Sequence, residues 1–298
     1  MGDRNAALVS GLMSQYVLQI IANGLLSGVV YILMALGFTL IFGIMRIVNF
    51  AHGELYMVGA SLVLVLYAHN GINYFLAVAL AAVITAGLGA LIERFLFRPF
   101  VKTELNGMIM SLGISIALQA GALIILGPAW QAMPRPVSGA LDFGGLVIPY
   151  DRLFVGLLAL AIITLFHLYL KHNRTGLAMQ AIAQDAETAS LMGVRVGSVS
   201  ALAFGIAAGL AAVAGGLMAP IYSVAPYMGE LPMLKAFVVV VLGGLGSIPG
   251  AVIGGLVIGL VESGFATVMN STAALIASFT LVVMVVLVRP RGLFGKAV

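Results

Sequence analysis

Apolar residues run almost without interruption along this chain, and the runs between charged residues are long enough to cross a membrane. Eight such runs can be separated, at 16–44, 54–69, 73–97, 106–127, 152–170, 198–224, 235–267 and 273–288. A helix needs roughly 20 apolar residues to cross a hydrocarbon core about 30 Å thick, and the alternating segments of a membrane barrel do not occur. The pattern therefore predicts an all-α integral membrane protein with about eight transmembrane segments, folded as one polytopic domain over 1–298.

Two of these runs are unusual for a single crossing. The first, 16–44, is longer than one untilted helix needs, and 235–267 is interrupted by a glycine-rich stretch. Each run is expected to form a tilted helix or a broken one. The interruption is either an unwound or re-entrant element beside a transport path or a cytoplasmic turn. Its glycines are weak candidates for path residues: Gly243, Gly244, Gly246 and Gly250.

Composition agrees with a chain embedded in lipid. Of its 298 residues, 62% are hydrophobic and only 8% are charged, against about 25% charged in a soluble domain. The net charge is +4, but the basic residues are spread over the loops, which argues against nucleic acid as a partner. The sequence contains no cysteine, so it predicts neither a disulfide nor a thiolate metal site.

The basic residues predict how the chain threads the membrane, because cytoplasmic loops carry an excess of Lys and Arg. The prediction places the C-terminal end inside and lets 235–267 enter and leave on one side. Ten basic residues then fall in the cytoplasm: Arg46, Arg94, Arg98, Lys102, Lys171, Arg174, Arg195, Arg289, Arg291 and Lys296. The remaining four are expected outside: Arg4, Arg135, Arg152 and Lys235. The side of the N-terminus depends on whether 16–44 crosses once.

Two loops are long enough to carry structure of their own. The external loop 128–151 is rich in Pro and Gly and holds the single tryptophan, Trp130, so it is expected to form an ordered cap. The cytoplasmic loop 171–197 has the Ala, Leu, Met and Gln content of a helix. We expect that helix to run from Thr175, which can cap its start, to Gly193, which can end it.

The cytoplasmic helix is expected to have an apolar and a polar side. The apolar side would comprise Leu177, Ile182, Ala189 and Met192. The polar side would comprise Gln180, Gln184, Asp185 and Glu187. Composition alone leaves open whether this helix lies in the lipid headgroups or presents itself to a soluble partner.

The spacing Glu187-Thr188-Ala189-x-x-x-Gly193 resembles the Glu-Ala-Ala-x-x-x-Gly loop of ABC importer permeases, with one Ala replaced by Thr. In those permeases the loop is the coupling helix, which sits in a cleft of the ATPase. The Ile-x-Leu-Pro that follows in that pattern is missing, because Ala203, Gly205 and Ile206 take its places. The resemblance implies coupling to an ATPase through Arg174, Thr175, Glu187, Ala189 and Gly193.

A second polar stretch, Asn49-Phe50-Ala51-His52-Gly53-Glu54, separates the first two apolar runs. Polar groups beside an interrupted helix are costly in lipid unless they face protein or a water-filled path. Asn49, His52 and Glu54 are therefore weak candidates for a translocation path or its gate. The alternative is a plain cytoplasmic turn whose polar side chains meet water.

This stretch resembles the Asn-Phe-Ala-His-Gly-Glu signature of the branched-chain amino acid permease family of ABC importers, the H-type membrane subunit of the leucine, isoleucine and valine system. The resemblance covers nearly the whole chain, including Arg174-Thr175-Gly176 and the closing Arg289-Pro290-x-Gly292-Leu293-Phe294-Gly295. It implies a multi-pass permease of the bacterial inner (plasma) membrane. Its implied partners are a second, related permease, two ATPase subunits and a periplasmic substrate-binding protein. The implied cargo is an amino acid, branched-chain or otherwise hydrophobic.

No enzyme chemistry is expected in the chain itself. The Gly-x-x-x-x-Gly-Lys-Ser/Thr pattern of a nucleotide loop does not occur, and the four histidines lack metal-ligand spacing. No cofactor is expected, since ATP and Mg²⁺ would be used by the partner ATPases. Two alternatives stay open: a permease for amides, urea or other hydrophobic acids, and a self-sufficient channel or secondary carrier. For a carrier, Glu262 is the partial candidate for an ion-binding residue.

Overall fold

The computed structural model describes residues 2–100, 103–143 and 146–295, with the side chains of all of these except 2–14 and 143. Its helices are α1 (Gly2–Met45), α2 (His52–Val63), α3 (Tyr74–Ile92), α4 (Arg98–Phe100), α5 (Glu104–Leu126), α6 (Tyr150–His172), α7 (Arg174–Gln184), α8 (Ala186–Leu191), α9 (Val196–Tyr222), α10 (Glu230–Gly243), α11 (Ile248–Val268) and α12 (Ser271–Val288). Two π-helical turns, η1 (Leu64–His69) and η2 (Glu93–Phe97), extend α2 and α3. The external loop holds an antiparallel hairpin of β1 (Ala140–Phe143) and β2 (Leu146–Pro149).

The prediction of an all-α membrane protein is confirmed. Within the described residues, seven helices are long and apolar enough to span a membrane: α1, the continuous helix from α3 to α4, α5, α6, α9, α11 and α12. All eight predicted runs are helical. The run 54–69 corresponds to α2 with η1, and 235–267 is divided between α10 and α11, so the broken-helix prediction holds for that run. The first run forms one unbroken helix that ends at Met45.

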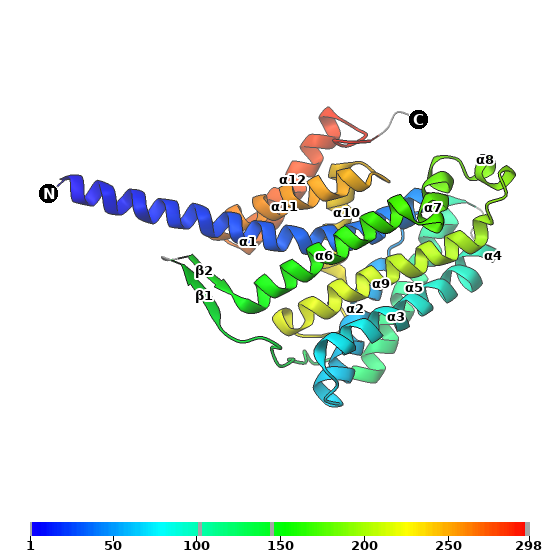
Figure 1. The fold of residues 1–298 in the computed structure, drawn as a ribbon, viewed down its shortest axis with the longest axis horizontal. Coiled ribbons are helices and arrows are strands. Elements are labelled where there is room, and N and C mark those ends of the chain that lie inside the picture. Colours follow the sequence, from blue (N-terminus) through cyan, green and yellow to red (C-terminus); the bar gives the residue numbers. More distant parts are fainter. Residues whose placement is uncertain (1, 101–102, 144–145, 296–298) are drawn as a thin grey trace.

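The bundle has two distinct ends (Figure 1), with α7 and α8 at one and the β1–β2 hairpin at the other. At the α7 end, the Arg46 side chain donates to the carbonyl oxygen of Ala183. There too, the chain after α12 returns to the end of α10, where the Leu293 and Phe294 N–H groups donate to Leu242 and Gly243. This basic end is cytoplasmic by the distribution of Arg and Lys. Of the predicted cytoplasmic residues, Lys102 and Lys296 lie outside the described part of the chain, as does the side chain of Arg4 among the external ones.

Two halves of the bundle repeat the same arrangement in opposite directions. The long helices α1 and α9 pack against each other, and each packs most extensively on the third helix of the other half: α1 along α11, and α9 along α3. Each long helix is followed by a short non-helical segment and a short helix, α2 or α10. Because α1 runs toward the cytoplasmic end and α9 away from it, the halves form an inverted repeat, an arrangement common in transporters.

Backbone geometry marks equivalent points in the two halves. Among the described residues, only Arg46 and Ser223 combine a side chain with a positive φ, at 56° and 63°. Arg46 follows α1 directly, and Ser223 follows α9 directly. A positive φ at a non-glycine residue is costly, so both long helices are followed by a strained residue.

The sequence carries the same repeat at the start of the two short helices. Gly53-Glu54-Leu55-Tyr56-Met57-Val58-Gly59-Ala60 begins α2, and Gly229-Glu230-Leu231-Pro232-Met233-Leu234-Lys235-Ala236 begins α10. The two segments share the pattern Gly-Glu-Leu-x-Met-x-x-Ala. The first pair of glycines is in direct contact, since a Cβ on Gly53 would lie 2.5 Å from the Gly229 carbonyl oxygen, and one on Gly229 would clash with Gly53. Only glycine lets two backbones approach this closely.

Candidate functional sites

The cytoplasmic segment forms two helices rather than the single helix predicted. The chain leaves the helical conformation at Asp185, whose φ and ψ are −155° and 108°. Asp185 is the N-cap of α8, and its carboxylate accepts from the Glu187 and Thr188 N–H groups at 2.9 and 3.1 Å. Aspartate is a strong N-cap, which explains the break between α7 and α8.

Of the two predicted ends of the cytoplasmic segment, the start was wrong and the end at Gly193 is confirmed. Asn173 caps α7, not Thr175, because Asn173 Oδ1 accepts from the Thr175 N–H at 3.0 Å and from its hydroxyl at 2.6 Å. The predicted cap at Thr175 was therefore wrong, since an equally good cap stands two residues earlier. Gly193 does end the segment, with φ of +87° just after α8, as expected for a glycine past a helix end.

The predicted apolar side is divided between a buried and an exposed part. Ile182 and Ala189 are buried, whereas Leu177 is half exposed. On α8, Leu191 and the following Met192 are 82% and 81% exposed. Met192, predicted on the same apolar side as Ile182 and Ala189, lies on the outer surface, since α8 begins anew at Asp185. Glu187 and Arg174 are also exposed.

The pair α7–α8 is held firmly to the membrane helices. Tyr169 and Thr175 share a hydroxyl hydrogen bond of 2.7 Å, and Gln180 Nε2 donates to the Leu170 carbonyl oxygen at 2.6 Å. The Arg46 Nη2 donates to the Ala183 carbonyl oxygen at 3.3 Å. These contacts join α7 to α6 and to Arg46, the residue that follows the end of α1.

Asp185 supplies a test of the α8 cap. Hydrogen bonds from the Thr188 hydroxyl and from the Thr188 and Glu187 N–H groups hold the pKa of Asp185 below its ordinary value of 3.8. The lowered pKa keeps the cap charged through the neutral range, and its contribution is lost only as the pH falls through the folded-state pKa. For Asp185→Ala we expect faster hydrogen exchange of the α8 amides at pH 7, and no such change for Asp142→Ala in the external hairpin. Unchanged α8 exchange would show that the cap does not hold this helix.

The polar stretch 49–54 lies inside the bundle rather than in a cytoplasmic turn. His52 and Asn49 are fully buried, and Glu54 is 2% exposed. The His52 Nε2 group donates to the Met34 carbonyl oxygen of α1 at 3.1 Å. At 1.5 Å per residue, Met34 lies about 16 Å from the end of α1, which is about half of a 30 Å hydrocarbon core. The chain therefore re-enters the membrane after Arg46, and α2 begins near its middle.

The three predicted path residues are brought together around the start of α2. Asn49 Oδ1 accepts from the Ala51 N–H at 3.1 Å. Glu54 Oε1 accepts from Gln119 Nε2 at 2.7 Å and from Ser115 Oγ at 3.3 Å. Among the described residues, Asn49 Nδ2, His52 Nδ1 and Glu54 Oε2 find no hydrogen-bond partner. Buried polar atoms left without partners are rare in structural positions, so this polar centre has unused binding capacity.

The start of α10 packs against the start of α2, beside the polar centre formed by Asn49, His52 and Glu54. Gly229 contacts Gly53 across the repeat, while the neighbouring Glu230, Tyr227 and Leu231 are exposed on the surface of the chain. An acidic side chain at this depth is costly against lipid and belongs beside water or protein. The face around Glu230 therefore borders an aqueous path or another subunit.

The four glycines proposed beside the path lie in and around the turn between α10 and α11. Gly243 ends α10, Gly244 and Gly246 take positive φ of 106° and 80° in the turn, and Gly250 lies in the first turn of α11. A Cβ on Gly244 would lie 2.5 Å from the Gly295 nitrogen. Of the two interpretations left open, the structure shows the cytoplasmic turn. The re-entrant element of this half is instead 223–229, ahead of α10.

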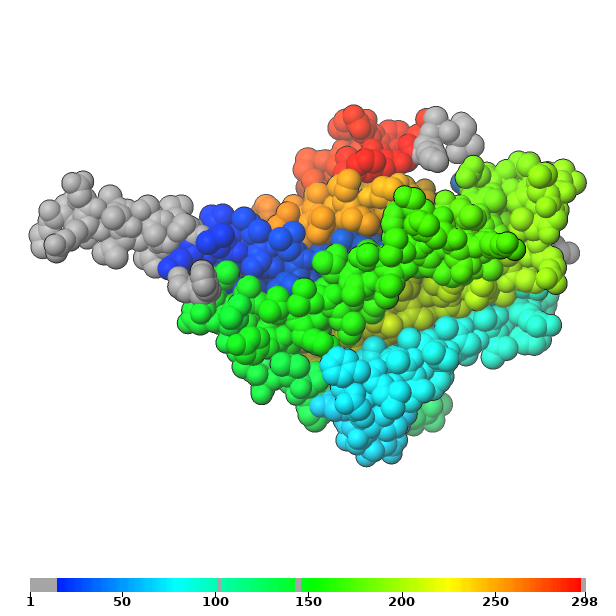
Figure 2. All heavy atoms as spheres, viewed as in Figure 1, coloured from blue at the N-terminus to red at the C-terminus, as the bar shows by residue number. Residues whose placement is uncertain are grey.

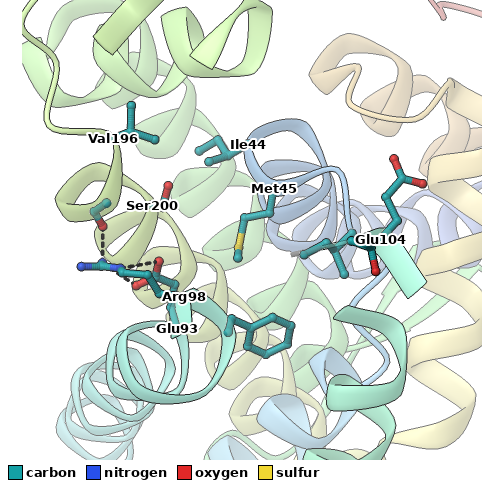
Figure 3. Close-up of a pocket in the computed structure, with 11 residues that line it drawn as sticks. Ile44, Met45, Glu93, Arg98, Glu104, Val196 and Ser200 are labelled. Atoms are coloured by element: carbon teal, nitrogen blue, oxygen red, sulfur yellow. Dashed lines mark hydrogen bonds and ion pairs between the residues drawn. The ribbon is translucent and has the colours of Figure 1, made fainter. Parts of the chain in front are cut away.

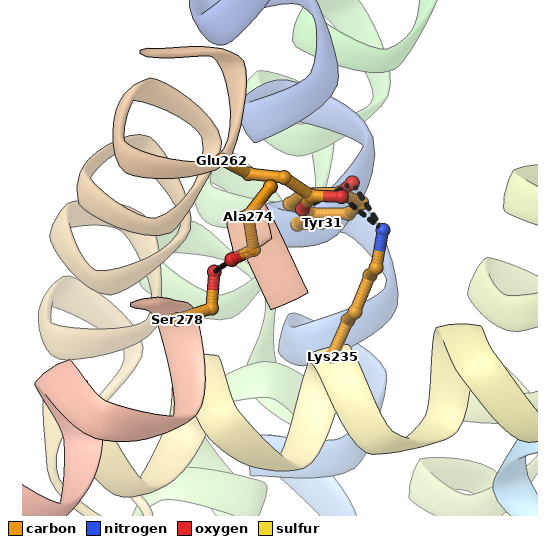
Figure 4. A network of polar contacts seen from close by, with 5 residues as sticks. All are labelled: Tyr31, Lys235, Glu262, Ala274 and Ser278. Atoms are coloured by element: carbon orange, nitrogen blue, oxygen red, sulfur yellow. Dashed lines mark hydrogen bonds and ion pairs between the residues drawn. The ribbon is translucent and has the colours of Figure 1, made fainter. Parts of the chain in front are cut away.

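Lys235 is inside the membrane, which corrects its predicted external position. Figure 4 shows its side chain pointing to Glu262 and Tyr31, with Nζ 2.5 Å from Glu262 Oε1 and 2.8 Å from the Tyr31 hydroxyl. The three residues join α10, α11 and α1. The external position of Lys235 was predicted from the distribution of basic residues alone, which takes no account of pairing with an acidic residue. The available signal was that Lys235 and Glu262 both fall in an otherwise uncharged run, where each needs a partner.

This ion pair should stabilise the arrangement of α10. Both side chains are only about one-fifth exposed, and removing one partner of a buried pair costs about 3 kcal/mol or more. We expect Glu262→Gln and Lys235→Met each to lower the midpoint of thermal unfolding, and the double variant to recover much of the loss. A double variant whose loss equals the sum of the single losses would contradict direct pairing.

A cavity of about 360 Å³ opens at the cytoplasmic end below the polar centre. Figure 3 shows it between the end of α1, at Ile44 and Met45, and the start of α9, at Val196 and Ser200. Its wall carries the ion pair of Glu93 with Arg98, 2.7 Å long. In the described part of the chain, no group of three or more His, Asp or Glu side chains could hold a metal ion.

Comparison with known families decides the class of the protein. Residues 20–288 match the family described as branched-chain amino acid transport system / permease component. The chain belongs to this permease family. Its apolar helices and its relatives make this permease a multi-pass protein of the inner membrane.

The permease is similar to named proteins over nearly its whole length. It is 36% identical to the high-affinity branched-chain amino acid transport system permease protein BraD of Pseudomonas aeruginosa, over 94% of this chain and 96% of BraD. It is also 36% identical to LivH of Escherichia coli, a protein of the same description, with the same coverage. A probable branched-chain amino acid transport permease of Methanocaldococcus jannaschii is 27% identical over 89% of this chain and 88% of its own length.

Proposed function

We propose that this permease forms part of an ATP-driven importer of branched-chain or other hydrophobic amino acids, and that α7–α8 couple it to the ATPases. The observation that carries the proposal is the hydrogen bond from Arg46 to Ala183. It joins the cytoplasmic helices to Arg46, the residue that follows the end of α1, and the chain then runs directly to the polar centre. The proposed coupling segment would thereby be connected to the proposed path.

The coupling surface would be the outer side of α8. Leu191 and Met192 offer two large apolar side chains, and Glu187 adds a negative charge that suits a basic ATPase surface. Thr175 and Ala189 would fix the helices from within, Gly193 would permit the turn that follows, and the exposed Arg174 would add a positive charge at the start of α7. Movement of α8 as a rigid body would displace α7 and, through α7, the turn at Arg46 after the end of α1.

The partners follow from the family and from the surface of the chain. We infer a second permease, two ATPase subunits and a periplasmic substrate-binding protein. Two helices at equivalent places in the repeat, α5 and α12, have the smallest buried share of the candidate spans, at 11% each, and α12 stands out as a separate ridge in Figure 2. Their free faces suit contact with the second permease. No cofactor is proposed for this chain, and ATP and Mg²⁺ would be bound by the ATPases.

An ATP-driven importer is favoured over a self-sufficient carrier. Glu262, the residue considered for binding a coupling ion, is already paired with Lys235, which removes that candidate for a carrier mechanism. The cargo rests on the relatives, whose names specify branched-chain amino acids.

The proposal is tested by tagging this chain and purifying it from its native membrane. We expect a second permease and two ATPases to copurify, and the complex in liposomes to take up leucine only with ATP and the binding protein. Leucine uptake by the purified chain alone would overturn the importer, and ATP-driven uptake of urea or an amide instead of leucine would correct the cargo.

A further inference from the structure

The cytoplasmic cavity has the size and the lining of a small-molecule site. Its volume of about 360 Å³ falls within the range of about 300–1,000 Å³ that is usual for ligand sites. Apolar side chains from three elements form much of its wall: Ile44 and Met45 of α1, Phe97 of η2 and Val196 of α9. Such a wall suits an aliphatic group.

Arg98 lines this cavity with part of its guanidinium group unused. Its Nε and Nη2 atoms donate to the buried Glu93 carboxylate at 3.3 and 2.7 Å, and Nη2 also donates to the Gly197 carbonyl oxygen. These bonds hold the guanidinium group in place and leave Nη1 without a hydrogen bond to any described residue. The side chain is 40% exposed. Because a guanidinium group binds carboxylates well, Nη1 is available to an anionic group of a ligand.

Glu104 brings a negative charge to the same cavity. It is exposed and lies in the first turn of α5. In the view of Figure 3, Met45 lies between Arg98 and Glu104. The cavity therefore offers a guanidinium group, a carboxylate and an apolar wall to one occupant. An amino acid with an aliphatic side chain carries the complementary groups, since it has a carboxylate, an ammonium group and an apolar side chain on one carbon.

We propose that this cavity binds a hydrophobic amino acid from the cytoplasm, with the carboxylate on Arg98, the ammonium group on Glu104 and the side chain against the apolar wall. The inference rests on the proposed function, because that function releases such an amino acid on this side of the membrane. Charge-assisted hydrogen bonds stabilise both charged groups of the ligand. The apolar wall favours leucine, isoleucine or valine over polar amino acids.

The place of the cavity connects this site to the coupling segment. One wall is the end of α1, which is followed by Arg46 and its bond to α7. Another wall is the start of α9, which follows α8 along the chain. A ligand that binds one arrangement of these walls shifts the protein toward that arrangement. Imported amino acid that accumulates in the cytoplasm would thereby slow further uptake.

The site can be tested by thiol labelling, because the chain contains no cysteine. Val196→Cys places one thiol in the cavity wall, beside Gly197, in the complete importer complex in lipid nanodiscs. Leucine at saturating concentration should slow the reaction of this chain with a maleimide by about fivefold or more. Ser198→Cys, exposed on α9 and outside the cavity, is the matched control and should react equally with and without leucine.

Analogues of leucine separate the contributions of its three groups. The analogue 4-methylpentanoate lacks the ammonium group and 3-methylbutylamine lacks the carboxylate, so neither should protect Val196→Cys. Serine keeps both charges but loses the aliphatic side chain, and it should bind about tenfold more weakly than leucine. Phosphatidylethanolamine also carries an ammonium group and an anionic group, so the labelling is repeated in nanodiscs with and without this lipid.

Four results would overturn the site. The first is an equal rate at Val196→Cys with and without leucine, and the second is equal protection by either analogue with a single charge. The third is protection that depends on phosphatidylethanolamine instead of leucine, which would assign the cavity to a lipid headgroup. The fourth is no labelling at all, which would show that the cavity is closed. ATP-driven leucine uptake by the wild-type complex separates these failures from failure of the importer itself.

Glu104→Gln tests the ammonium partner directly. Glu104 is exposed, so the variant should fold, while the charge that binds the ammonium group is lost. We expect the affinity of leucine, measured by protection of Val196→Cys, to fall by about tenfold or more. Glu187→Gln is the matched control, because Glu187 is an exposed carboxylate on α8 outside the cavity, and it should leave this affinity unchanged. Equal affinity in both variants would contradict the role of Glu104.

Uptake by liposomes tests the effect on transport. The complex is reconstituted with ATP and unlabelled leucine inside, and labelled leucine and the binding protein are added outside. At saturating internal leucine we expect the initial rate to be about fivefold lower than with internal serine, and Glu104→Gln to remove most of this difference. An initial rate that is the same with internal leucine and internal serine would overturn the control of uptake by this cavity.

Discussion

Replacing Leu191 and Met192 together by aspartate is expected to abolish ATP-driven uptake while the permease still folds. Both side chains are more than four-fifths exposed at the tip of the cytoplasmic helices, so the folded chain loses little. Apolar anchors at the centre of an interface commonly contribute about 2 kcal/mol or more each. Their loss together should weaken ATPase binding by about a thousandfold.

The measurement is copurification of the ATPases, followed by uptake in liposomes. Leu141→Asp is the control, because Leu141 is an exposed apolar residue in the hairpin at the external end. It should leave both readouts unchanged. Normal ATP-driven uptake by the Leu191→Asp, Met192→Asp variant would remove α8 from the coupling surface.

Substituting valine for Gly53 or Gly229 is expected to have the largest effect on folding. A Cβ on Gly53 would lie 2.5 Å from the Gly229 carbonyl oxygen and 2.7 Å from the Met233 Cβ. The clash is with backbone, which cannot move as a flexible side chain does. The cost should reach or exceed the upper end of the usual 1–3 kcal/mol for overpacking, at about 3 kcal/mol.

Because the two glycines share one contact, their effects should not add. Once Gly53→Val has pushed α2 and α10 apart, Gly229→Val should cost less than it does alone. Thermal unfolding of the two single variants and the double variant measures this coupling, with Gly113→Val as the control in open space. Full additivity would contradict the close approach of the two short helices.

Much of the architecture is predictable from the sequence because lipid imposes long apolar runs. All eight runs are helices, and the break within 235–267 was located correctly. The apolar runs do not reveal how deep the polar segments between them lie in the membrane. The stretch 49–54 could equally have been a turn in water, and only its burial beside Met34 shows that the chain re-enters the membrane.

The repeat was missed although its signal was present. The pattern Gly-Glu-Leu-x-Met-x-x-Ala occurs at both Gly53 and Gly229, and comparing the chain with itself would have revealed it. Recognising the repeat would also have placed the second re-entrant element ahead of α10 rather than at 243–250. Lys235 could not be placed from charge counting, because its environment is set by Glu262, a residue 27 positions away.

The coupling segment shows how a single residue changes an exposed surface. Its helical content and its end at Gly193 were predicted correctly, but Asp185 was assigned to the polar side of one helix. As an N-cap it begins a second helix instead. The sequence signal was an aspartate followed within three residues by Glu187 and Thr188, a pattern typical of a helix start. This break exposes Met192.

The proposed coupling requires that movement of the cytoplasmic helices α7 and α8 reaches the permease residues at the centre of the membrane through Arg46. The most direct measurement places Tyr227→Cys, on the exposed segment before α10, in the reconstituted complex and follows its reaction with an impermeant thiol reagent added outside. We predict that the rates with and without trapped ATP differ by at least about fivefold, as is usual for coupled sites, and that Arg46→Ala abolishes most of this difference. Equal rates in the two states, in a complex that still hydrolyses ATP and takes up leucine, would contradict the account.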